Sequence, residues 1–582
     1  MLIERRQCSI RSMWVLPRTV LAVSVLSGCR PEAPTRDSAE VALGGPATSL
    51  VVLVLDGLRV EESFGEGSSS INGAPTDSFL PQLRERYLDQ GLRATAAANI
   101  GVTITTEAHV ELLTGRRQSL ATFERGTTET YRSDVPTLFE LVRKERGLSR
   151  SQTALYTNSV VVEDTTWSVH PEHRGRYAPT YVHDASSAFP GGLQADMDRD
   201  LMVRVQDHMK AHDTHMMLVN LHGIDMAGHM GEGTAYLDMV EQVDGPLVDF
   251  LSFIEESDTY GDRTLVAMVA DHGRHRWGED DDWRNHGDQC MGCRQLPLFL
   301  WAPGDIHSGE LDAVVTLADL SQTFAAWLDV DLAHGHGRVV ESIFQGPTPG
   351  GSVVGDGAVA ASGGTVVMQR WTAAGEPRAE IVVADRDGRV LSDPDAFTSE
   401  APQMVASETL TAICWRSLPV VEISQTLGDW SWEPRCAVRT PQRDWTQIGF
   451  PDVVVSASWA PAMTIDGQGS LWVVSDDNPN GYTGSADVRP LLARWDVERG
   501  WMAERNASEE RSLPTSPAAV ALDFDAGERA QLLVGVAFST DHAQGRDTRS
   551  IGIDRVTIND LGKQTWSEVL RLEPSGSIER RE

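Results

Sequence analysis

The sequence predicts an α/β protein whose mostly parallel sheet is flanked by helices on both faces, followed by a β-rich C-terminal domain that is propeller-like or a sandwich. Three observations predict this. Between residues 50 and 344, apolar runs of strand length alternate with helical patterns. Several of these runs end abruptly in Asp, His or Gly. After residue 346 the helical periodicity is lost, and runs rich in Val, Thr and Trp alternate with Asp-Gly turns.

Length and charge narrow the class of protein. At 582 residues the chain is longer than one hydrophobic core usually serves, so we expect two or more domains. The formal net charge of −34, without clusters of Lys and Arg, argues against a nucleic-acid backbone as partner. We divide the chain into a signal peptide, a flexible tether, an α/β domain and a β-rich repeat domain, at residues 1–29, 30–48, 49–345 and 346–582.

The N-terminus predicts export and anchoring. Arginines precede the apolar run 20–26, which ends in Ser27-Gly28-Cys29. This pattern resembles a bacterial lipoprotein signal, in which the cysteine is lipidated, and the run is much shorter than the roughly 20 residues of a membrane-spanning helix. We therefore expect Cys29 to anchor the protein in a bacterial cell envelope, on the periplasmic or cell-surface side. A short buried helix that ends in an unrelated cysteine is the alternative.

Apolar runs and helix signals give the order of elements in the α/β domain. Runs without charge predict buried strands at 50–55, 216–220, 264–270 and 296–301. Amphipathic patterns, two of them with Pro in the first turn and Gly just past the end, predict helices at 81–90, 136–146, 234–254 and 317–328. The third of these helices is either continuous or divided at Gly245-Pro246. Strands that alternate with helices predict a parallel sheet covered on both faces.

The C-terminal segment contains a weak internal repeat. Each of three units opens at a proline and closes near a tryptophan: Pro402 and Trp445, Pro461 and Trp501, Pro517 and Trp566. The units are slightly longer than common propeller repeats of about 40 to 50 residues. Three units, with a fourth around 366–390, are few for a closed ring, so a β-sandwich is the alternative. For this domain we expect a structural role or the binding of a surface glycan or protein.

Cysteine usage agrees with export. Apart from Cys8 and Cys29 in the leader, four cysteines remain, an even number that can pair in an oxidising compartment. Cys290 and Cys293 form a single CxxC without a second one to complete a zinc knuckle. We therefore expect a local disulfide there in preference to a metal or redox site.

Carboxylate and imidazole side chains follow several predicted strands. In an open α/β sheet, ligands bind beyond the carboxyl ends of the strands. Asp225 and His229, four residues apart, can contact one metal ion. The alternatives are an ordinary turn for Asp56, a surface pair for Asp225 and His229, and a loop contact for His286, but the position of these residues after predicted strands favours a metal site. The candidate ligands are Asp56, Asp225, His229, Asp271, His272 and His286.

Thr105 is the candidate nucleophile. Thr105-Thr106-Glu107 opens an apolar-periodic stretch, so we expect its hydroxyl at a helix N-terminus, where unpaired N–H groups favour anions. An ordinary helix cap with an acidic first turn is the alternative. Hydrolysis of a phosphate ester requires a deprotonated nucleophile and positive charge on the attacking and leaving oxygens, which two divalent metal ions supply.

The order of these motifs resembles the alkaline phosphatase superfamily, which includes nucleotide pyrophosphatase/phosphodiesterases and cofactor-independent phosphoglycerate mutases. Residues 55–59 (Leu-Asp-Gly-Leu-Arg) resemble the first phosphodiesterase motif. Thr105 stands four residues before His109 and ten before Gly115, which matches the nucleophile spacing. Residues 225–229 (Asp-Met-Ala-Gly-His) resemble the mutase branch.

This resemblance, which covers about residues 49–345, implies a metal-dependent phosphoester hydrolase, either a phosphatase or a phosphodiesterase. It implies a small-molecule phosphoester substrate and a phospho-threonine intermediate. It also implies two divalent metal ions, zinc or, as the alternative, manganese. One ion is expected among Asp56, Thr105, Asp271 and His272, and the other among Asp225, His229 and His286.

Two departures from the family pattern bear on the substrate. Sulfatases of the superfamily use a cysteine converted to formylglycine, so Thr105 in its place argues against sulfatase chemistry. Phosphodiesterases carry an asparagine three residues after the nucleophile, where this chain has Ala108. The oxyanion contact is then expected from Asn99, Arg116 or Arg117, and monoester and diester substrates both stay open. The alternative functions are a phosphoryl or phosphoalcohol transferase of the same superfamily, or an inactive surface binding protein.

Overall fold

The computed structural model describes residues 48–580 with gaps. Up to residue 345 the gaps are 66, 117–131, 134, 169, 171, 174, 185–195, 232, 277–281, 288–289 and 336. The description resumes at 359 and omits 363–364, 373–377, 384–388, 393–395, 420–432, 451–460, 467, 478–488, 506–514, 525–529, 540–548, 559–563 and 573–577. The expected signal peptide, its Cys29 and the tether up to residue 47 lie outside the described residues. Within the described ranges, no helix is both long and apolar enough to cross a membrane.

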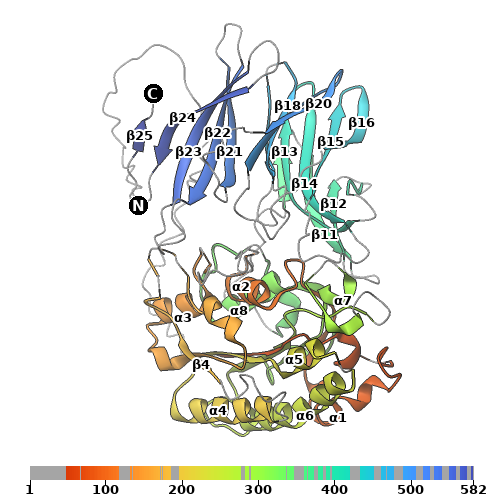
Figure 1. The fold of residues 1–582 in the computed structure, drawn as a ribbon, viewed down its shortest axis with the longest axis vertical. Coiled ribbons are helices and arrows are strands. Elements are labelled where there is room, and N and C mark those ends of the chain that lie inside the picture. Colours follow the sequence, from red (N-terminus) through yellow and green to blue (C-terminus); the bar gives the residue numbers. More distant parts are fainter. Residues whose placement is uncertain are drawn as a thin grey trace, which may run out of the picture.

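A nine-stranded mixed sheet forms the centre of the α/β part (Figure 1). Its strands are β1 (Ser49–Leu55), β2 (Leu92–Ala98), β3 (Thr153–Thr157), β4 (Thr180–His183), β5 (Met216–Leu221), β6 (Thr264–Val269), β7 (Gln295–Leu296), β8 (Leu298–Trp301) and β9 (Gly309–Thr316). The order is β4-β3-β5-β1-β6-β8-β2-β7, with β9 paired to β2. The first five strands of this order are parallel, whereas β8 runs antiparallel to β6. This confirms the predicted mostly parallel sheet.

Helices cover both faces of this sheet (Figure 1). They are α1 (Pro81–Arg86), α2 (Thr105–Thr114), α3 (Leu138–Arg146), α4 (Met197–Ala211), α5 (Gly223–His229), α6 (Gly233–Glu255), α7 (Met291–Arg294) and α8 (Leu317–Trp327). Short 3₁₀ turns are η1 (Val60–Glu62), η2 (Thr76–Ser78), η3 (Leu88–Gln90), η4 (Arg150–Gln152), η5 (Val160–Thr165), η7 (Asp282–Arg284) and η8 (Glu341–Ile343). Helices α1, α4 and α6 lie on one face, and α2, α3 and α8 lie on the other.

β1 is a central strand of the sheet, and every residue from Ser49 to Leu55 is buried because both faces of the strand are covered. It pairs with β5 on one side and β6 on the other, with Leu55 opposite Leu221 and Val54 opposite Val269. The residues that follow these strands therefore emerge together at one edge of the sheet. This edge carries the candidate site.

Several element boundaries differ from the predicted ones. The helix expected at 81–90 ends at Arg86 and is followed by a 3₁₀ turn. The helix expected from 136 begins at Leu138, because Thr137 caps it and Glu140 completes a capping box. The strand expected at 296–301 is interrupted at Pro297, which has no N–H for the ladder. Helix α6 is continuous through Pro246.

After residue 345 the described strands form three sheets of seven, four and five strands. The first contains β10 (Val359–Ser362), β11 (Thr365–Thr372), β12 (Arg378–Val383), β13 (Ala396–Ala406), β14 (Thr411–Pro419), β15 (Glu433–Thr440) and β16 (Arg443–Ile448). The second contains β17 (Ala462–Ile465), β18 (Leu471–Asp477), β19 (Arg489–Asp496) and β20 (Gly500–Arg505). The third contains β21 (Thr515–Phe524), β22 (Ala530–Ser539), β23 (Arg549–Ile558), β24 (Gln564–Leu572) and β25 (Ile578–Arg580).

The weak sequence repeat corresponds to successive four-stranded antiparallel units, β13–β16, β17–β20 and β21–β24. Trp445, Trp501 and Trp566 each lie in the fourth strand of a unit. The first strands contact one another in sequence, β13 with β17 and β17 with β21. A buried cluster that includes Cys414 and Leu471 joins the first two units face to face, a packing that propeller blades and sandwiches share.

The four cysteines outside the leader behave as two different pairs. Cys414 and Cys436 lie opposite each other on β14 and β15 and form a disulfide. The local disulfide expected at Cys290 and Cys293 is not formed, because their Sγ atoms lie 3.2 Å apart, beyond the roughly 2.05 Å of an S–S bond.

Replacing both Cys414 and Cys436 by alanine is expected to lower the free energy of unfolding of the C-terminal sheets by about 3 kcal/mol, because the bond closes a loop with a sequence separation of 22. Urea unfolding followed by tryptophan fluorescence measures the change. Reductant added to the wild type serves as the control and is expected to cause a similar loss. Equal midpoints for the variant and the oxidised wild type would contradict the prediction.

Candidate metal centre

The candidate ligands lie where the central strands end. Asp56 follows β1, Asp271 and His272 follow β6 after one residue, and Asp225 lies in α5 beyond β5. Thr105 is the first residue of α2, and its N-cap is Ile104. The alternative of Thr105 as an ordinary cap is therefore wrong.

The first group consists of Asp56, Asp271 and His272, whose ligand atoms all lie within 4.8 Å of one another. His272 Nε2 lies 3.5 Å from Asp56 Oδ1 and 3.6 Å from Asp271 Oδ2. Thr105 Oγ1 lies 3.3 Å from the same nitrogen. His109 packs behind the group, with its Nδ1 2.7 Å from Thr105 O and 3.6 Å from Asp271 Oδ2. The threonine hydroxyl therefore joins this group.

The second group consists of Asp225, His229 and His286. His229 Nε2 lies 3.4 Å from Asp225 Oδ2, and His286 Nε2 lies 3.5 Å from Asp225 Oδ1. The two Nε2 atoms face each other at 3.0 Å. His286 is oriented through its Nδ1, which lies 2.9 Å from Thr103 O. One carboxylate and two imidazoles thus converge on one point.

The two groups are neighbours. The rings of His272 and His286, one from each group, stack with centroids 3.7 Å apart and an interplanar angle of 12°. His222 lies between the groups, because its Nδ1 is 2.8 Å from Asp56 Oδ2 and 3.9 Å from Asp225 Oδ2. Asn220 donates to the same oxygen of Asp56 at 3.0 Å.

Two glycines in the motifs allow this close packing. Gly57 has φ +68°, and a Cβ there would lie 2.8 Å from Asp225 Oδ1. A Cβ on Gly228 would lie 2.3 Å from Arg274 Cζ. A side chain at either position would therefore displace the second group or the arginine that supports it. This steric requirement explains why glycine follows Asp56 and precedes His229 in the sequence.

Arg274 holds Asp225 of the second group in place. Its guanidinium is fully buried and donates to the carbonyl oxygen of Asp225 at 2.7 Å and to the carboxylate of Asp225. It also donates to the carbonyl oxygens of Trp283 at 3.0 Å and Arg284 at 2.7 Å. One side chain thus fixes Asp225 and the segment that leads to His286.

Burial and crowding shift the pKa values of the carboxylates in opposite directions. Burial raises the pKa of Asp271 well above its usual range, and the charges of Asp56 and Asp225 add to this. Burial acts in the same direction on Asp225, but Arg274, His286 and His229 outweigh it and hold the pKa of Asp225 well below its usual range. Carboxylates this close cannot all be ionised without added positive charge.

The histidines also respond to burial. Burial lowers the pKa of His272, and burial together with His272 lowers the pKa of His286 well below its usual range. Burial also lowers the pKa of His109 to about 4. Burial opposes protonation of His222, but the carboxylate of Asp56 outweighs it and raises the pKa of His222 to about 9. Neutral imidazoles are the form that binds metal.

The residues present fit a pair of divalent cations. Asp56 Oδ1 and Asp271 Oδ2 are buried and have no hydrogen-bond partner among the described residues. A buried carboxylate oxygen in that state is costly unless a cation contacts it. The first group offers oxygen and nitrogen ligands and the second offers one oxygen and two nitrogens, which suit zinc and also manganese.

Three residues were expected to contact substrate: Asn99, Arg116 and Arg117. Asn99 is fully buried, donates to Val102 O at 3.0 Å and Asp271 O at 2.9 Å, and accepts from Gly101 N. Its amide therefore holds the backbone that leads to Thr105. Arg116 follows the C-terminus of α2, at the opposite end of the helix from Thr105. Arg117 lies outside the described residues.

Sequence reasoning missed His222, Asn220 and Arg274. The first two stand in the segment Asn220-Leu-His-Gly-Ile-Asp225, and Arg274 follows Asp271-His272-Gly273 directly. Their proximity to the motifs is a signal that could have found them. Nothing local in the sequence shows that Arg274 reaches back to Asp225.

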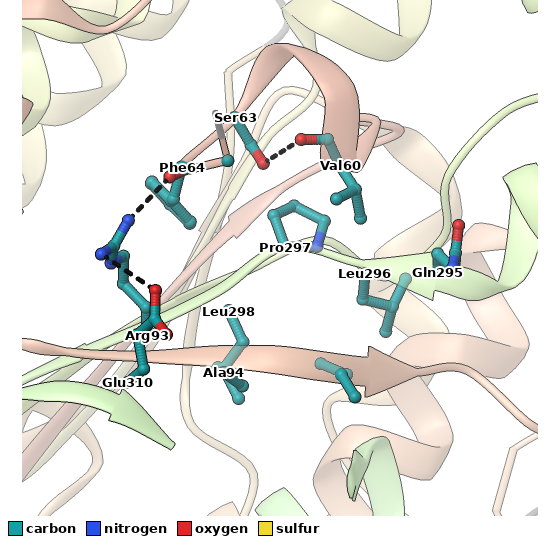
Figure 2. A pocket seen from close by; sticks show the side chains of 13 residues that line it. Val60, Ser63, Phe64, Arg93, Ala94, Gln295, Leu296, Pro297, Leu298 and Glu310 are labelled. Carbon is teal, nitrogen blue, oxygen red and sulfur yellow. Dashed lines mark hydrogen bonds and ion pairs between the residues drawn. The ribbon is translucent and has the colours of Figure 1, made fainter. Parts of the chain in front are cut away.

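A separate cavity of about 270 Å³ lies along β2, β7 and β8 (Figure 2). Figure 2 shows Arg93 connecting the backbone oxygen of Phe64 with the carboxylate of Glu310 beside this cavity. Its lining contains neither Thr105 nor any member of the two groups.

A family model, described as the Metalloenzyme superfamily, matches residues 188–331. This segment contains the second group together with Asp271, His272 and Arg274. The resemblance to the alkaline phosphatase superfamily is confirmed over this part of the chain. With the Asp and His clusters, the match supports a metal-dependent hydrolase or transferase.

Solved structures resemble the chain only distantly, and no curated protein matches it. Lipoteichoic acid synthase LtaP from Listeria monocytogenes is 12% identical with a TM-score of 0.36, over 60% of this chain and 87% of its own. Wild-type alkaline phosphatase PafA is 12% identical with a TM-score of 0.39, over 51% and 99%. Murine ectonucleotide pyrophosphatase/phosphodiesterase 5 is 9% identical with a TM-score of 0.39, over 51% and 100%. Similarity at this level carries no information about the substrate.

Arg274→Lys is expected to weaken metal binding by the second group about 10- to 100-fold, because lysine keeps the charge but loses the fork that orients Asp225. Competition with a chromophoric chelator measures the affinity. Arg263→Lys is the matched control, because Arg263 precedes β6 at the opposite end of the strand and pairs with Asp213. Equal affinities for both variants would contradict the role of Arg274.

In metal-free protein, His222 is expected to make folding stability fall as the pH rises. Its folded pKa of about 9 exceeds its unfolded value of 6.5, so its contribution is complete below pH 6.5 and is lost as the pH rises through 9. The loss is roughly 3 kcal/mol at most. Urea unfolding in the presence of a chelator, compared between the wild type and His222→Gln, measures it. Parallel pH profiles for the two proteins would rule out this contribution.

Proposed function

We propose that the chain is a metal-dependent phosphoester hydrolase that uses Thr105 as its nucleophile. The match of residues 188–331 to the Metalloenzyme superfamily is the premise. The observation that carries the proposal is the position of Thr105 Oγ1, 3.3 Å from His272 Nε2. That nitrogen also faces the unpartnered oxygens of Asp56 and Asp271. A hydroxyl at a helix N-terminus beside buried carboxylates is suited to activation by a cation and to attack on an anion.

Two groups of residues would hold the cations in this proposal. Asp56, Thr105, Asp271 and His272 would hold one, and Asp225, His229 and His286 would hold the other. Zinc is preferred, and manganese is the alternative. When bound, such cations lower the pKa of a hydroxyl and neutralise charge on the leaving oxygen.

The chain's own residues then perform a double displacement. Thr105 Oγ1 loses its proton and attacks phosphorus, and the bond from phosphorus to the ester oxygen breaks as the alcohol leaves with a proton. Water next attacks the phospho-threonine, which releases the phosphate product and restores the threonine hydroxyl. The first N–H groups of α2 have no partners within the helix and favour the anionic phosphoryl group. Asn99, His109 and His222 hold the reacting groups in place.

We further propose that the enzyme works in a bacterial cell envelope, on the periplasmic or cell-surface side. The basic and apolar pattern before Cys29 supports a lipid anchor, and residues 30–48 would serve as its tether. Residues 49–345 would form the catalytic domain. Residues 346–582 would form an accessory domain that binds a surface glycan or protein or has a structural role. The substrate would be a small phosphoester outside the cytoplasm.

Thr105→Ala is expected to reduce hydrolysis of aryl phosphate mono- and diesters by at least about 1,000-fold, because the covalent route is lost. Metal content is expected to stay nearly intact, since the Asp and His ligands remain. The measurement is steady-state turnover on a panel of esters with metal-reconstituted protein. Thr106→Ala is the matched control, because the Thr106 hydroxyl donates to Val161 O and not toward His272.

The same panel tests the rival functions. Equal turnover by the wild type and Thr105→Ala on every ester would refute Thr105 as the nucleophile, and turnover at the uncatalysed rate in both would leave a binding protein. With a labelled phosphoryl group, recovery on added alcohols in preference to water would identify a transferase. Recovery as free phosphate or as a phosphate monoester is expected for the hydrolase.

A further inference from the structure

We infer that His275, Cys290 and Cys293 form a third metal site, for a thiophilic divalent cation of the zinc class. The site shares no residue with the two groups at the strand ends. It would clamp the segment after β6 to the turn at α7. The inference does not depend on the proposed reaction.

The three side chains already converge. One ligand atom from each lies within 4.8 Å of the other two, and all three residues are buried, at 6%, 5% and 0% exposure. The two Sγ atoms are 3.2 Å apart, and the backbone N–H of Cys293 donates to Cys290 Sγ at 3.3 Å. This contact fixes the position of the Cys290 sulfur, and thiolate sulfur is the form of cysteine that binds metal.

Two glycines bring the segments together. The backbone N–H of Gly273 donates to Cys293 O at 2.8 Å, and a Cβ on Gly273 would lie 2.0 Å from Gly292 O. Gly292 is inside the CxxC turn, and a Cβ there would lie 2.3 Å from Arg274 O. Any other residue at either position would push the turn away from His275. The sequence thus contains the small residues that this site requires.

The ligand chemistry selects the cation. One imidazole and two thiolates are ligands that zinc prefers, whereas magnesium and calcium prefer oxygen. A tetrahedral ion would take its fourth ligand from water or another group. The ions at the strand ends would instead have carboxylate and imidazole ligands, so sulfur ligation distinguishes the third site spectroscopically.

The position of the site indicates a structural role. His275 follows Arg274, which holds Asp225, and Cys293 precedes Arg294, which donates to Asn99 O at 2.9 Å and Gly101 O at 3.3 Å. Both connections lead to the candidate metal centre. A cation bound to His275, Cys290 and Cys293 would therefore link Arg274, which holds Asp225, to Arg294, which holds the backbone at Asn99 and Gly101.

The competing state is a disulfide between Cys290 and Cys293. Its formation would shorten the Sγ separation from 3.2 Å to roughly 2.05 Å and remove both thiolates. Disulfide and metal site therefore exclude each other. This makes the inference testable in the wild type without any variant.

The test is cobalt substitution of the full-length protein purified with reductant. A sulfur-to-cobalt charge-transfer band in the near ultraviolet is expected in the wild type, with about one more metal ion per chain than the two groups account for. Absence of the band in folded, cobalt-loaded wild type would overturn the inference. Mass spectrometry showing Cys290 and Cys293 joined in that sample would overturn it as well.

Variants test which residues produce the sulfur-to-cobalt charge-transfer band. Cys290→Ser, Cys293→Ser and His275→Ala are expected to lose about one cobalt ion per chain and to lose or shift the band. Asp225→Asn is the matched control, because it weakens the second group but leaves all three ligands of the third site, so its band is expected to persist. A band that persists in the cysteine variants, or that disappears in Asp225→Asn alone, would overturn the assignment. None of these readouts depends on ester hydrolysis.

Discussion

The structure depends on one electrostatic constraint, the convergence of three buried carboxylates at the carboxyl edge of the central strands. Asp56, Asp225 and Asp271 are almost completely buried and repel one another, and the charges of Asp56 and Asp225 add to burial in raising the pKa of Asp271. Arg274 and the histidines neutralise part of this charge. Divalent cations would neutralise the rest, so the repulsion that opposes folding in their absence becomes a source of metal affinity when they bind.

The segment after β6 links most parts of the centre. Asp271 and His272 belong to the first group, Arg274 holds Asp225 of the second, and His275 points to the cysteine turn. Four of the five successive residues 271–275 thus serve three sets of ligands, and the fifth, Gly273, lets the backbone approach that turn. Because these residues lie in one short segment, the positions of the three sets of ligands depend on one another. A displacement here would reach both strand-end groups.

Much of the fold was predictable where local and tertiary preferences agree. The buried runs at β1, β5, β6 and β8 are apolar on both faces, so their strand character is visible without context. β2 was missed because Leu92–Ala98 is mostly alanine, a helix former, and becomes a strand only by pairing with β8 and β9. The repeat after residue 346 was visible from its prolines and tryptophans, but the grouping of strands into stacked units was not.

The sequence by itself determined the residue types of the candidate site and their order, because Asp, His and Thr at strand and helix ends are local patterns. It also determined that Thr105 opens a helix. Only the tertiary structure decided that His222 bridges the groups, that Arg274 reaches Asp225, and that Cys290 and Cys293 face His275 without a disulfide between them. These contacts join residues from different segments, and their distances follow from sheet order and packing, which no local pattern encodes.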